Sequence, residues 1–244
     1  MMSFSLQFVL VLIGTFMIAL VLTPLVRLFS FKIDAVDYPN ARRINTKPMP
    51  SAGGLAIVIA FSIATLVFIP MLTSTTAPIK SYLSYTLPVV GAGWIIALTG
   101  LIDDVKELSA KKKMIGILLA ASLVWFLTDF RLNDFKIPFG GPLLHFEPWL
   151  SYLLTVIWIV AITNAVNLID GLDGLVSGVS IISLVTMGIV SYFFLPVPNL
   201  FLTMTIFVLV ASIAGFFPFN YHPAILYLGD TGALFIGFMI SVLS

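Results

Sequence analysis

Four polar clusters interrupt an otherwise strongly apolar chain, and each contains groups that can do chemistry. They supply carboxylates, carboxamides and cations, which are groups that hold phosphates and divalent metal ions. Such groups are expensive at bilayer depth, so clusters that meet at one membrane interface indicate a functional site. In chain order the clusters are DYPNARRINTKPMPSAGG at 37–54, IDDVKELSAKKK at 102–113, NAVNLIDGLDGL at 164–175 and FNYHPAILYLGDTG at 219–232.

The second cluster places two adjacent carboxylates, Asp103 and Asp104, at the end of an apolar run. Adjacent carboxylates repel and shift each other's pKa values unless a cation or a proton intervenes. We therefore expect a positive charge beside them. Magnesium, which prefers oxygen ligands and substrate phosphates, is one candidate, and Lys113 is another. An ordinary solvated loop at a helix end is the alternative interpretation.

In the third cluster, Asn164, Asn167, Asp170 and Asp173 recur at every third residue. At helical spacing these side chains lie roughly along one stripe. Gly171 allows the backbone to open or to approach a ligand closely. Capping of the next helix would explain Asp173 alone, so we interpret the stripe as functional.

The fourth cluster contains Asn220, His222, Tyr227 and Asp230. Locally, Asp230 is equally typical of a helix N-cap. Tyr227 suits stacking on a planar base, and it also suits the aromatic belt of a membrane interface. His222 precedes a proline and is typical of a hydrogen-bonding loop residue.

The first cluster carries Arg42, Arg43 and Lys47 on a proline-stiffened loop that ends in two glycines. These cations suit a polyanion such as a diphosphate, and they suit anionic lipid headgroups as well.

The elements that must position these clusters are membrane helices. Hydrophobic residues make up 60% of the chain and charged residues 9%, against about a quarter charged in soluble proteins, so a soluble globular protein is excluded. No cysteine is present, which excludes disulfides, thiolate metal sites and cysteine nucleophiles. Apolar runs long enough to span hydrocarbon lie at 4–26, 52–72, 83–102, 149–169, 175–195 and 200–219, with a shorter one at 114–127.

The last apolar run, 233–243, would rise only about 16 Å as a helix, roughly half of the hydrocarbon thickness. We therefore expect an all-α integral membrane protein in which 1–244 is one polytopic helical domain. About seven spans would be complete and an eighth truncated, with C-terminal spans and a last cytoplasmic loop missing.

If each run crosses once, all four clusters share one side of the membrane. Nine of the 12 Lys and Arg residues fall on that side, so the positive-inside rule makes it cytoplasmic. On the opposite side, residues 129–148 alternate apolar and polar around a Gly-Gly-Pro turn, which predicts a small hairpin.

Together the clusters favour phosphoryl chemistry on a membrane-bound acceptor. They hold oxygen ligands, cations and a candidate stacking aromatic, while Walker, zinc and GxSxG motifs are absent from the sequence. Two other classes remain open. A membrane prenyltransferase has motifs that DDVKE resembles, but a second aspartate-rich motif is missing. A transporter would place its ionisable groups near mid-membrane.

The four motifs, in this order and spacing, closely resemble those of the polyprenyl-phosphate N-acetylhexosamine-1-phosphate transferases. That family includes undecaprenyl-phosphate N-acetylglucosamine-1-phosphate transferases and the phospho-N-acetylmuramoyl-pentapeptide transferase. The resemblance covers residues 37–232, and NxxNxxDGxDGL is its most specific element. The DxPNxR form of the first loop favours the N-acetylglucosamine branch.

The resemblance implies a magnesium-dependent transferase of the bacterial cell membrane, with manganese as the alternative ion and its active site on the cytoplasmic face. N-acetylglucosamine 1-phosphate would pass from UDP-N-acetylglucosamine to undecaprenyl phosphate with release of UMP. This is a first lipid-linked step of cell-envelope polysaccharide or teichoic acid synthesis. Implied partners are membrane lipid and a second copy of the chain, but no nucleic acid.

The resemblance also implies residue roles. Asp103, Asp104 and Lys113 would lie near the phosphates, and our own mechanistic hypothesis makes Asp103 the candidate base, with Asp104 and Lys113 orienting the acceptor. The catalytic set is Asp103, Asp104, Lys113, Asp170 and Asp173. Asp230 is the principal metal ligand and Asn167 a second. The substrate-binding set is Arg42, Arg43, Lys47, Asn164, Asn167, Gly171, Leu172, Asn220 and Tyr227, in which Asn220 and Tyr227 hold the uracil. Asn45 and Ile117 depart from the histidine and glutamine common in the family.

Overall fold

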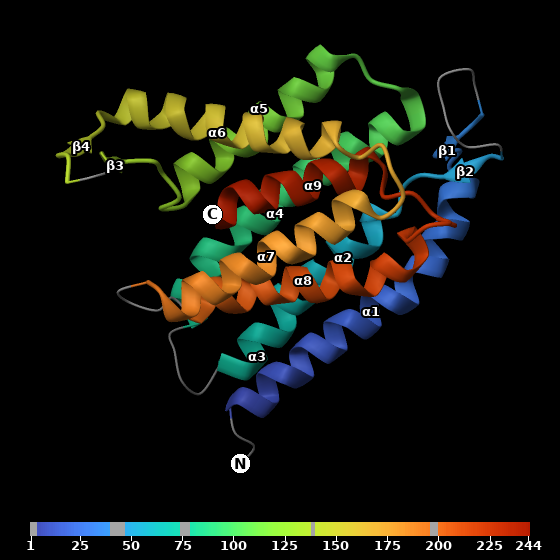
Figure 1. Ribbon diagram of the computed structural model, residues 1–244, viewed down its shortest axis with the longest axis horizontal. Coiled ribbons are helices and arrows are strands. Elements are labelled where there is room, and N and C mark those ends of the chain that lie inside the picture. Colours follow the sequence, from blue (N-terminus) through green and yellow to red (C-terminus); the bar gives the residue numbers. More distant parts are fainter. Residues whose placement is uncertain (1–3, 40–46, 74–78, 138–139, 196–199) are drawn as a thin grey trace.

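Each apolar run of the sequence forms a helix, because a backbone in hydrocarbon must satisfy its own hydrogen bonds. The computed structural model describes residues 4–39, 47–73, 79–137, 140–195 and 200–244 (Figure 1). Its helices are α1 (Phe4–Lys32), α2 (Gly54–Ile63), α3 (Ile69–Thr73), α4 (Ile79–Lys106), α5 (Ala110–Leu127), α6 (Pro148–Leu168), α7 (Leu175–Phe193), α8 (Leu200–Asn220) and α9 (Gly229–Leu243). A π-helical turn, η1 (Ala64–Phe68), joins α2 to α3.

The helices confirm a polytopic all-α membrane protein. Within the described residues, six helical segments have the length and composition needed to cross a membrane. They are Ser5–Lys32, Gly54–Met71, Tyr82–Lys106, Pro148–Leu168, Leu175–Phe193 and Leu200–Asn220. The exact number of spans stays a prediction, since α5 and α9 are helices outside this set.

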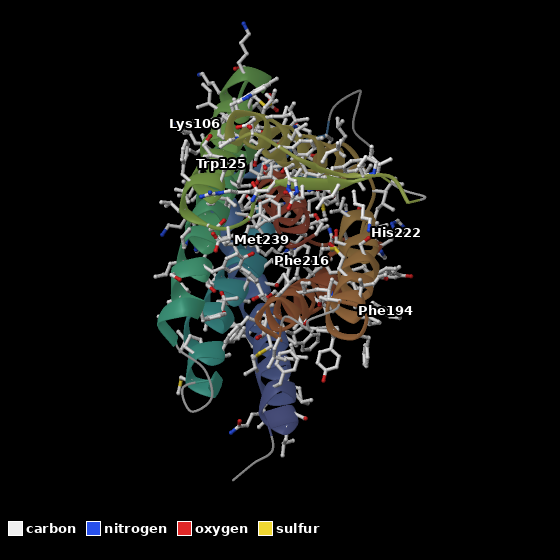
Figure 2. All side chains as sticks on the ribbon, turned by 90° about the vertical axis from the view of Figure 1, so that its left-hand side faces the viewer. Lys106, Trp125, Phe194, Phe216, His222 and Met239 are labelled. Atoms are coloured by element: carbon white, nitrogen blue, oxygen red, sulfur yellow. The ribbon has the colours of Figure 1, made fainter. Side chains whose placement is uncertain are left out.

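Helix α9 lies inside the bundle and packs chiefly against α4 and α6 (Figure 1). Figure 2 shows Phe216 and Met239 among the helices, and both side chains are fully buried. Glycines permit the close packing: a Cβ on Gly237 would lie 2.8 Å from the Cα of Thr163 on α6. Lipid provides no hydrophobic driving force for helices to associate, so close packing through small residues helps to hold membrane helices together.

Helix α1 presents an apolar stripe to the outside of the bundle. Leu10, Ile13, Met17, Val21 and Leu25 recur at helical spacing, and all are exposed. A surface of this kind suits contact with lipid tails. It leaves the polar chemistry to the helix ends.

Two short antiparallel hairpins lie at opposite ends of the bundle (Figure 1). Strand β1 (Val36–Asp37) pairs with β2 (Met49–Pro50), beside the first polar cluster. Strand β3 (Asp134–Lys136) pairs with β4 (Leu143–His145), with Asp134 opposite His145. The second pairing confirms the hairpin predicted within 129–148.

Candidate active site

The polar clusters converge at the bundle end that carries β1 and β2 (Figure 1). The carboxyl ends of α4 and α6 meet the amino ends of α5 and α9 there. Ser51 of the first cluster joins them through a 3.4 Å contact from its Oγ to Oδ1 of Asp104. Groups far apart in the sequence therefore form one polar site.

Asp230, in the first turn of α9, is at the centre of this site. Its Oδ2 accepts a hydrogen bond of 3.0 Å from Nζ of Lys113, and its Oδ1 accepts one from Nδ2 of Asn167. Lys113 also forms an ion pair of 2.6 Å with Oδ2 of Asp103. One ammonium group thus bridges two carboxylates, and Lys113 is the cation found beside the paired aspartates.

The two adjacent aspartates face different partners. Asp103 directs Oδ2 to Lys113, while its Oδ1 accepts a hydrogen bond of 2.5 Å from the backbone N–H of Leu108. Asp104 accepts hydrogen bonds from the backbone N–H groups of Asp230 and Thr231. Of these two adjacent aspartates, it is Asp103 that forms the ion pair with the bridging ammonium group.

Asp170 follows α6 and lies beside this network. Burial and, second, the negative charge of Asp230 raise the pKa of the Asp170 carboxyl to about 7. A carboxyl group with that pKa exchanges its proton near neutral pH, which is common at functional sites.

Asp173 and Asn220 hold two loops of the site together. Oδ2 of Asp173 accepts a hydrogen bond of 3.0 Å from the backbone N–H of Ala224 and lies 2.9 Å from Nδ1 of His222. Asn220 is buried; its Oδ1 accepts a hydrogen bond from Ser177 at 2.8 Å, and its Nδ2 donates to the Leu226 carbonyl at 3.3 Å. Binding of uracil by Asn220 stays a prediction. To bind uracil, the Asn220 side chain would have to give up its hydrogen bonds to Ser177 and Leu226.

His222 itself is at the periphery, as Figure 2 shows, with 80% of its side chain exposed. Tyr227 connects the fourth cluster to the first: its N–H donates to the Pro50 carbonyl at 2.9 Å. Burial and the charges of Asp173 and Asp37 raise the pKa of Tyr227. Its phenol therefore stays neutral at physiological pH.

A pocket of about 270 Å³ opens beside the Lys113 ammonium group. Asn164 and Asn167 line it from α6, with Leu108, Ala110, Lys113 and Met114 on the other side. Nδ2 of Asn164 donates a hydrogen bond of 2.8 Å to the Val160 carbonyl one helical turn earlier. The pocket combines apolar walls with amide and ammonium groups, which suits the phosphate end of a lipid.

The remaining predicted residues lie at the edge of the site, away from it, or outside the described residues. Gly171 and Leu172 are exposed in the turn before α7. Lys47 is exposed beside β2. Arg42, Arg43 and Asn45 lie outside the described residues. Ile117 is buried in the helix packing.

The polar atoms at this site are of the types that bind a magnesium ion. Asp230, Asp103 and the amide of Asn167 offer oxygen atoms, and Mg²⁺ takes one or two carboxylates with water and substrate phosphates. Among the described residues, no group of three or more His, Asp or Glu side chains is arranged to hold a metal. To hold an ion, the Asn167 amide would have to present its oxygen and Lys113 would have to release the carboxylates, with water and substrate phosphates as further ligands.

Sequence reasoning missed the residues that support this network. Ser51, Thr231 and Ser177 each hydrogen-bond a predicted site residue. Of these three residues, only Thr231 could have been suspected from the sequence, because it directly follows Asp230 at the start of an apolar run. Asp230 itself is not the N-cap that its sequence context allowed, because α9 begins at Gly229 and Leu228 occupies the cap position.

Comparison with known proteins identifies the family. The profile of glycosyl transferase family 4 matches residues 86–244, which contain three of the four polar clusters. The chain belongs to this family. The match includes every helix end that contributes to the Lys113 bridge, so the converging residues are part of the family 4 domain.

Three relatives illustrate the similarity. A probable undecaprenyl-phosphate N-acetylglucosaminyl 1-phosphate transferase of Bacillus subtilis is 39% identical over 98% of this chain and 62% of its own length. A decaprenyl-phosphate N-acetylglucosaminephosphotransferase of Mycolicibacterium smegmatis is 32% identical over 90% and 55%. A phospho-N-acetylmuramoyl-pentapeptide-transferase of Staphylococcus saprophyticus is 33% identical over 97% and 74%. The chain thus spans little more than half the length of the first two.

Proposed function

We propose that this family 4 protein transfers N-acetylglucosamine 1-phosphate from UDP-N-acetylglucosamine to undecaprenyl phosphate and releases UMP. The observation that carries the proposal is the Lys113 ammonium group, which bridges Asp103 and Asp230 beside a pocket at one end of a membrane bundle. The 39% identity to the Bacillus subtilis transferase supports this choice of substrates.

The reaction forms one P–O bond and breaks another. An oxygen of the lipid phosphate attacks the β-phosphorus of the nucleotide sugar, and the bond from that phosphorus to the bridging oxygen breaks. The electron pair leaves with UMP, and the product is a lipid diphosphate that carries the sugar. Such transfers depend mainly on positioning and on stabilising charge.

Asp103 would accept the last proton of the lipid phosphate. Its side chain is 7% exposed and faces Lys113, which lines the pocket. The same lysine can hold the incoming phosphate by a charge-assisted hydrogen bond as it leaves a carboxylate. Since the lipid phosphate is already anionic near neutral pH, proton removal is a minor part of the work.

Asp230 and Asn167 are the residues that would hold a magnesium ion, with manganese as the alternative. When bound, such an ion neutralises the diphosphate and the leaving UMP. Asp170, next to Asp230, would keep a neutral carboxyl available as a hydrogen-bond donor below pH 7. Tyr227 and the turn at Gly171 and Leu172 would contact the nucleoside.

We place this site on the cytoplasmic face of the bacterial cell membrane. Lys106, Lys111 and Lys112 are exposed at the site end, as expected for the side that retains positive charge. The donor nucleotide would then enter from the cytosol, and the acceptor from the inner leaflet. A homodimer stays a prediction.

UMP release tests the proposal directly. Membranes containing the full-length gene product receive undecaprenyl phosphate and either UDP-N-acetylglucosamine or the muramoyl-pentapeptide nucleotide. UMP release with the first nucleotide alone is the expected result. Release with the second alone would assign the activity of the Staphylococcus relative, which is 33% identical. In a parallel reaction supplied with a prenyl diphosphate in place of the nucleotide sugar, release of pyrophosphate would instead indicate prenyl transfer.

A covalent route is distinguished by a trapping experiment. Direct transfer predicts that enzyme incubated with the nucleotide sugar alone forms no protein adduct. An aspartyl-phosphosugar adduct, detected by mass spectrometry of the acid-quenched protein, would replace direct transfer with two displacement steps.

A further inference from the structure

We propose that Asp104 is a positioning residue that holds the first turn of α9 and thereby places Asp230. This inference rests on the proposed function for its effect on turnover, but its structural part can be measured without any substrate. It differs from the acceptor-orienting role expected from the sequence.

The N-terminus of α9 needs a partner from elsewhere in the molecule. The first N–H groups of a helix have no acceptor within the helix and are usually satisfied by a polar N-cap side chain. Here the N-cap residue is Leu228, which makes no side-chain capping hydrogen bond. Its apolar side chain is buried and has no atom that could accept one.

Asp104, at the end of α4, supplies the missing acceptor. Its Oδ1 accepts the N–H of Asp230 at 2.8 Å, and its Oδ2 accepts the N–H of Thr231 at 3.1 Å. The hydroxyl of Thr231 also donates to Oδ2, at 2.5 Å. A carboxylate at this position also interacts favourably with the helix dipole. The cap of α9 therefore comes from a residue 127 positions away from Thr231.

Asp104 has little capacity left for a substrate. A carboxylate has about four acceptor positions. Three are used by Asp230 and Thr231, and the Oγ of Ser51 approaches Oδ1 at 3.4 Å. Asp103, by contrast, directs one oxygen to the Lys113 ammonium group that lines the pocket.

Glycines allow α4 and α9 to come this close. A Cβ on Gly100, one turn before Asp104, would lie 2.4 Å from the backbone oxygen of Asp230. A Cβ on Gly229 would lie 2.8 Å from Oδ2 of Asp104, and Gly229 has φ +70°. Glycines at these two positions leave room for the Asp104 carboxylate at the end of α9. This is a second observation, separate from the hydrogen bonds, that Asp104 belongs at this helix end.

The consequence for function is the placement of Asp230. Its backbone N–H is held by Asp104, so loss of that bond releases the turn that carries the Asp230 carboxylate. A displacement of about 1 Å at a reacting centre costs on the order of 100-fold in rate.

The test combines hydrogen exchange with turnover in four variants. Hydrogen–deuterium exchange of the first turn of α9 is measured on the detergent-solubilised protein without substrate or metal, and UMP release is measured on the same preparations. Asp104→Asn and Thr231→Val should each accelerate exchange of this turn by about tenfold, since each removes a hydrogen-bonding group. Both should lower kcat more than they raise KM.

Two matched variants separate positioning from direct catalysis. Asp103→Asn should lose turnover while exchange in α9 stays at the wild-type rate. Thr231→Ser, which keeps the hydroxyl, should restore both exchange and kcat relative to Thr231→Val. If Asp104→Asn fails to fold, the Thr231 pair still tests the cap.

The outcomes distinguish this inference from the proposed function. Unchanged exchange in Asp104→Asn or in Thr231→Val overturns the positioning role, whatever happens to turnover. If exchange is accelerated in the variants but the wild-type protein releases no UMP, the capping role of Asp104 is supported and the proposed function is wrong. Accelerated exchange with wild-type kcat in both variants overturns the claim that the cap places Asp230 for catalysis.

Discussion

The two ends of the bundle each carry a carboxylate paired with a basic side chain, but the pairs differ in origin and in burial. At the site end, Lys113 connects Asp103 to Asp230, and the three side chains are 19%, 7% and 27% exposed. At the far end, Asp134 and His145 face each other across one hairpin and are 52% and 74% exposed.

This difference indicates where polar groups have been brought together for chemistry. Half-buried charges lose hydration, and that cost is offset only when several partners surround them. The site end meets this requirement with partners from four helices. An exposed local pair is screened by water and contributes little. Substitutions at the two ends should therefore have very different effects.

The largest expected effect is that of Asp230→Asn. This change removes the charge that Lys113 and Asn167 surround. We expect UMP release to fall by at least about 100–1,000-fold, as for loss of a main electrostatic group in other enzymes. Gel filtration in detergent checks that the protein stays folded. Wild-type turnover in this variant would show that catalysis does not depend on the Asp230 carboxylate.

Lys113→Met should have the next largest effect. Without the ammonium group, Asp103 and Asp230 face each other without their shared cation. We expect UMP release to fall by about 100-fold, as for a misplaced reacting group. The matched control is Lys112→Met, because Lys112 is exposed on the same helix turn and should change turnover by no more than about twofold. Equal losses in the two variants would show that only net charge matters.

Asp170→Asn should have a smaller effect that depends on pH. The Asp170 carboxyl has a pKa of about 7 when folded, raised by burial and by Asp230, against about 3.9 when unfolded. Between these values the folded protein retains a proton that the unfolded chain has released. Wild-type stability therefore falls as pH rises from about 4 to about 7, with a slope of up to about 1.4 kcal/mol per pH unit.

Melting temperatures in detergent without divalent ions measure this difference. The stability of Asp170→Asn relative to the wild type should be lowest near pH 4 and should rise until about pH 7, the pKa of the folded group. A difference that is constant with pH, or that shrinks as pH rises, would contradict the raised pKa.

The smallest effect is expected at the far end. His145→Ala removes the exposed partner of Asp134 and should change UMP release by less than about twofold and stability by less than about 1 kcal/mol. The same assays as above measure both quantities. A loss as large as that of Lys113→Met would end the contrast between the two ends of the bundle.

The helices could be predicted from the sequence because a long apolar run in lipid has one stable backbone conformation. The meeting of the clusters also followed, since alternating spans return polar loops to the same end. Helix α9 shows the limit: its apolar run starts at 233, but the helix begins at Gly229. The four additional residues depend on the Asp104 cap, which comes from α4 and leaves no local signal.

Individual side-chain partners were harder to predict than the site itself. The alternation of Asn and Asp in 164–175 indicated a functional stripe, but not that Asn167 turns to Asp230 while Asp173 turns to Ala224. Likewise, nothing in the order of Asp103 and Asp104 indicates which one faces Lys113. These choices depend on how each helix is rotated in the packed bundle, which the order of residues within one cluster does not reveal.

Transfer from a cytosolic nucleotide requires the site end of the bundle to face the cytoplasm. Residues 1–244 contain no cysteine, so a single cysteine introduced there can be labelled in intact cells with a membrane-impermeant maleimide and read out on the purified protein against the parent without the introduced cysteine. Lys112 and Lys136 are a matched exposed pair, one at the site end and one on β3. We predict that Lys136→Cys is labelled in intact cells and Lys112→Cys only after permeabilisation. Labelling of Lys112→Cys in intact cells would place the site on the outer face and contradict transfer from a cytosolic nucleotide.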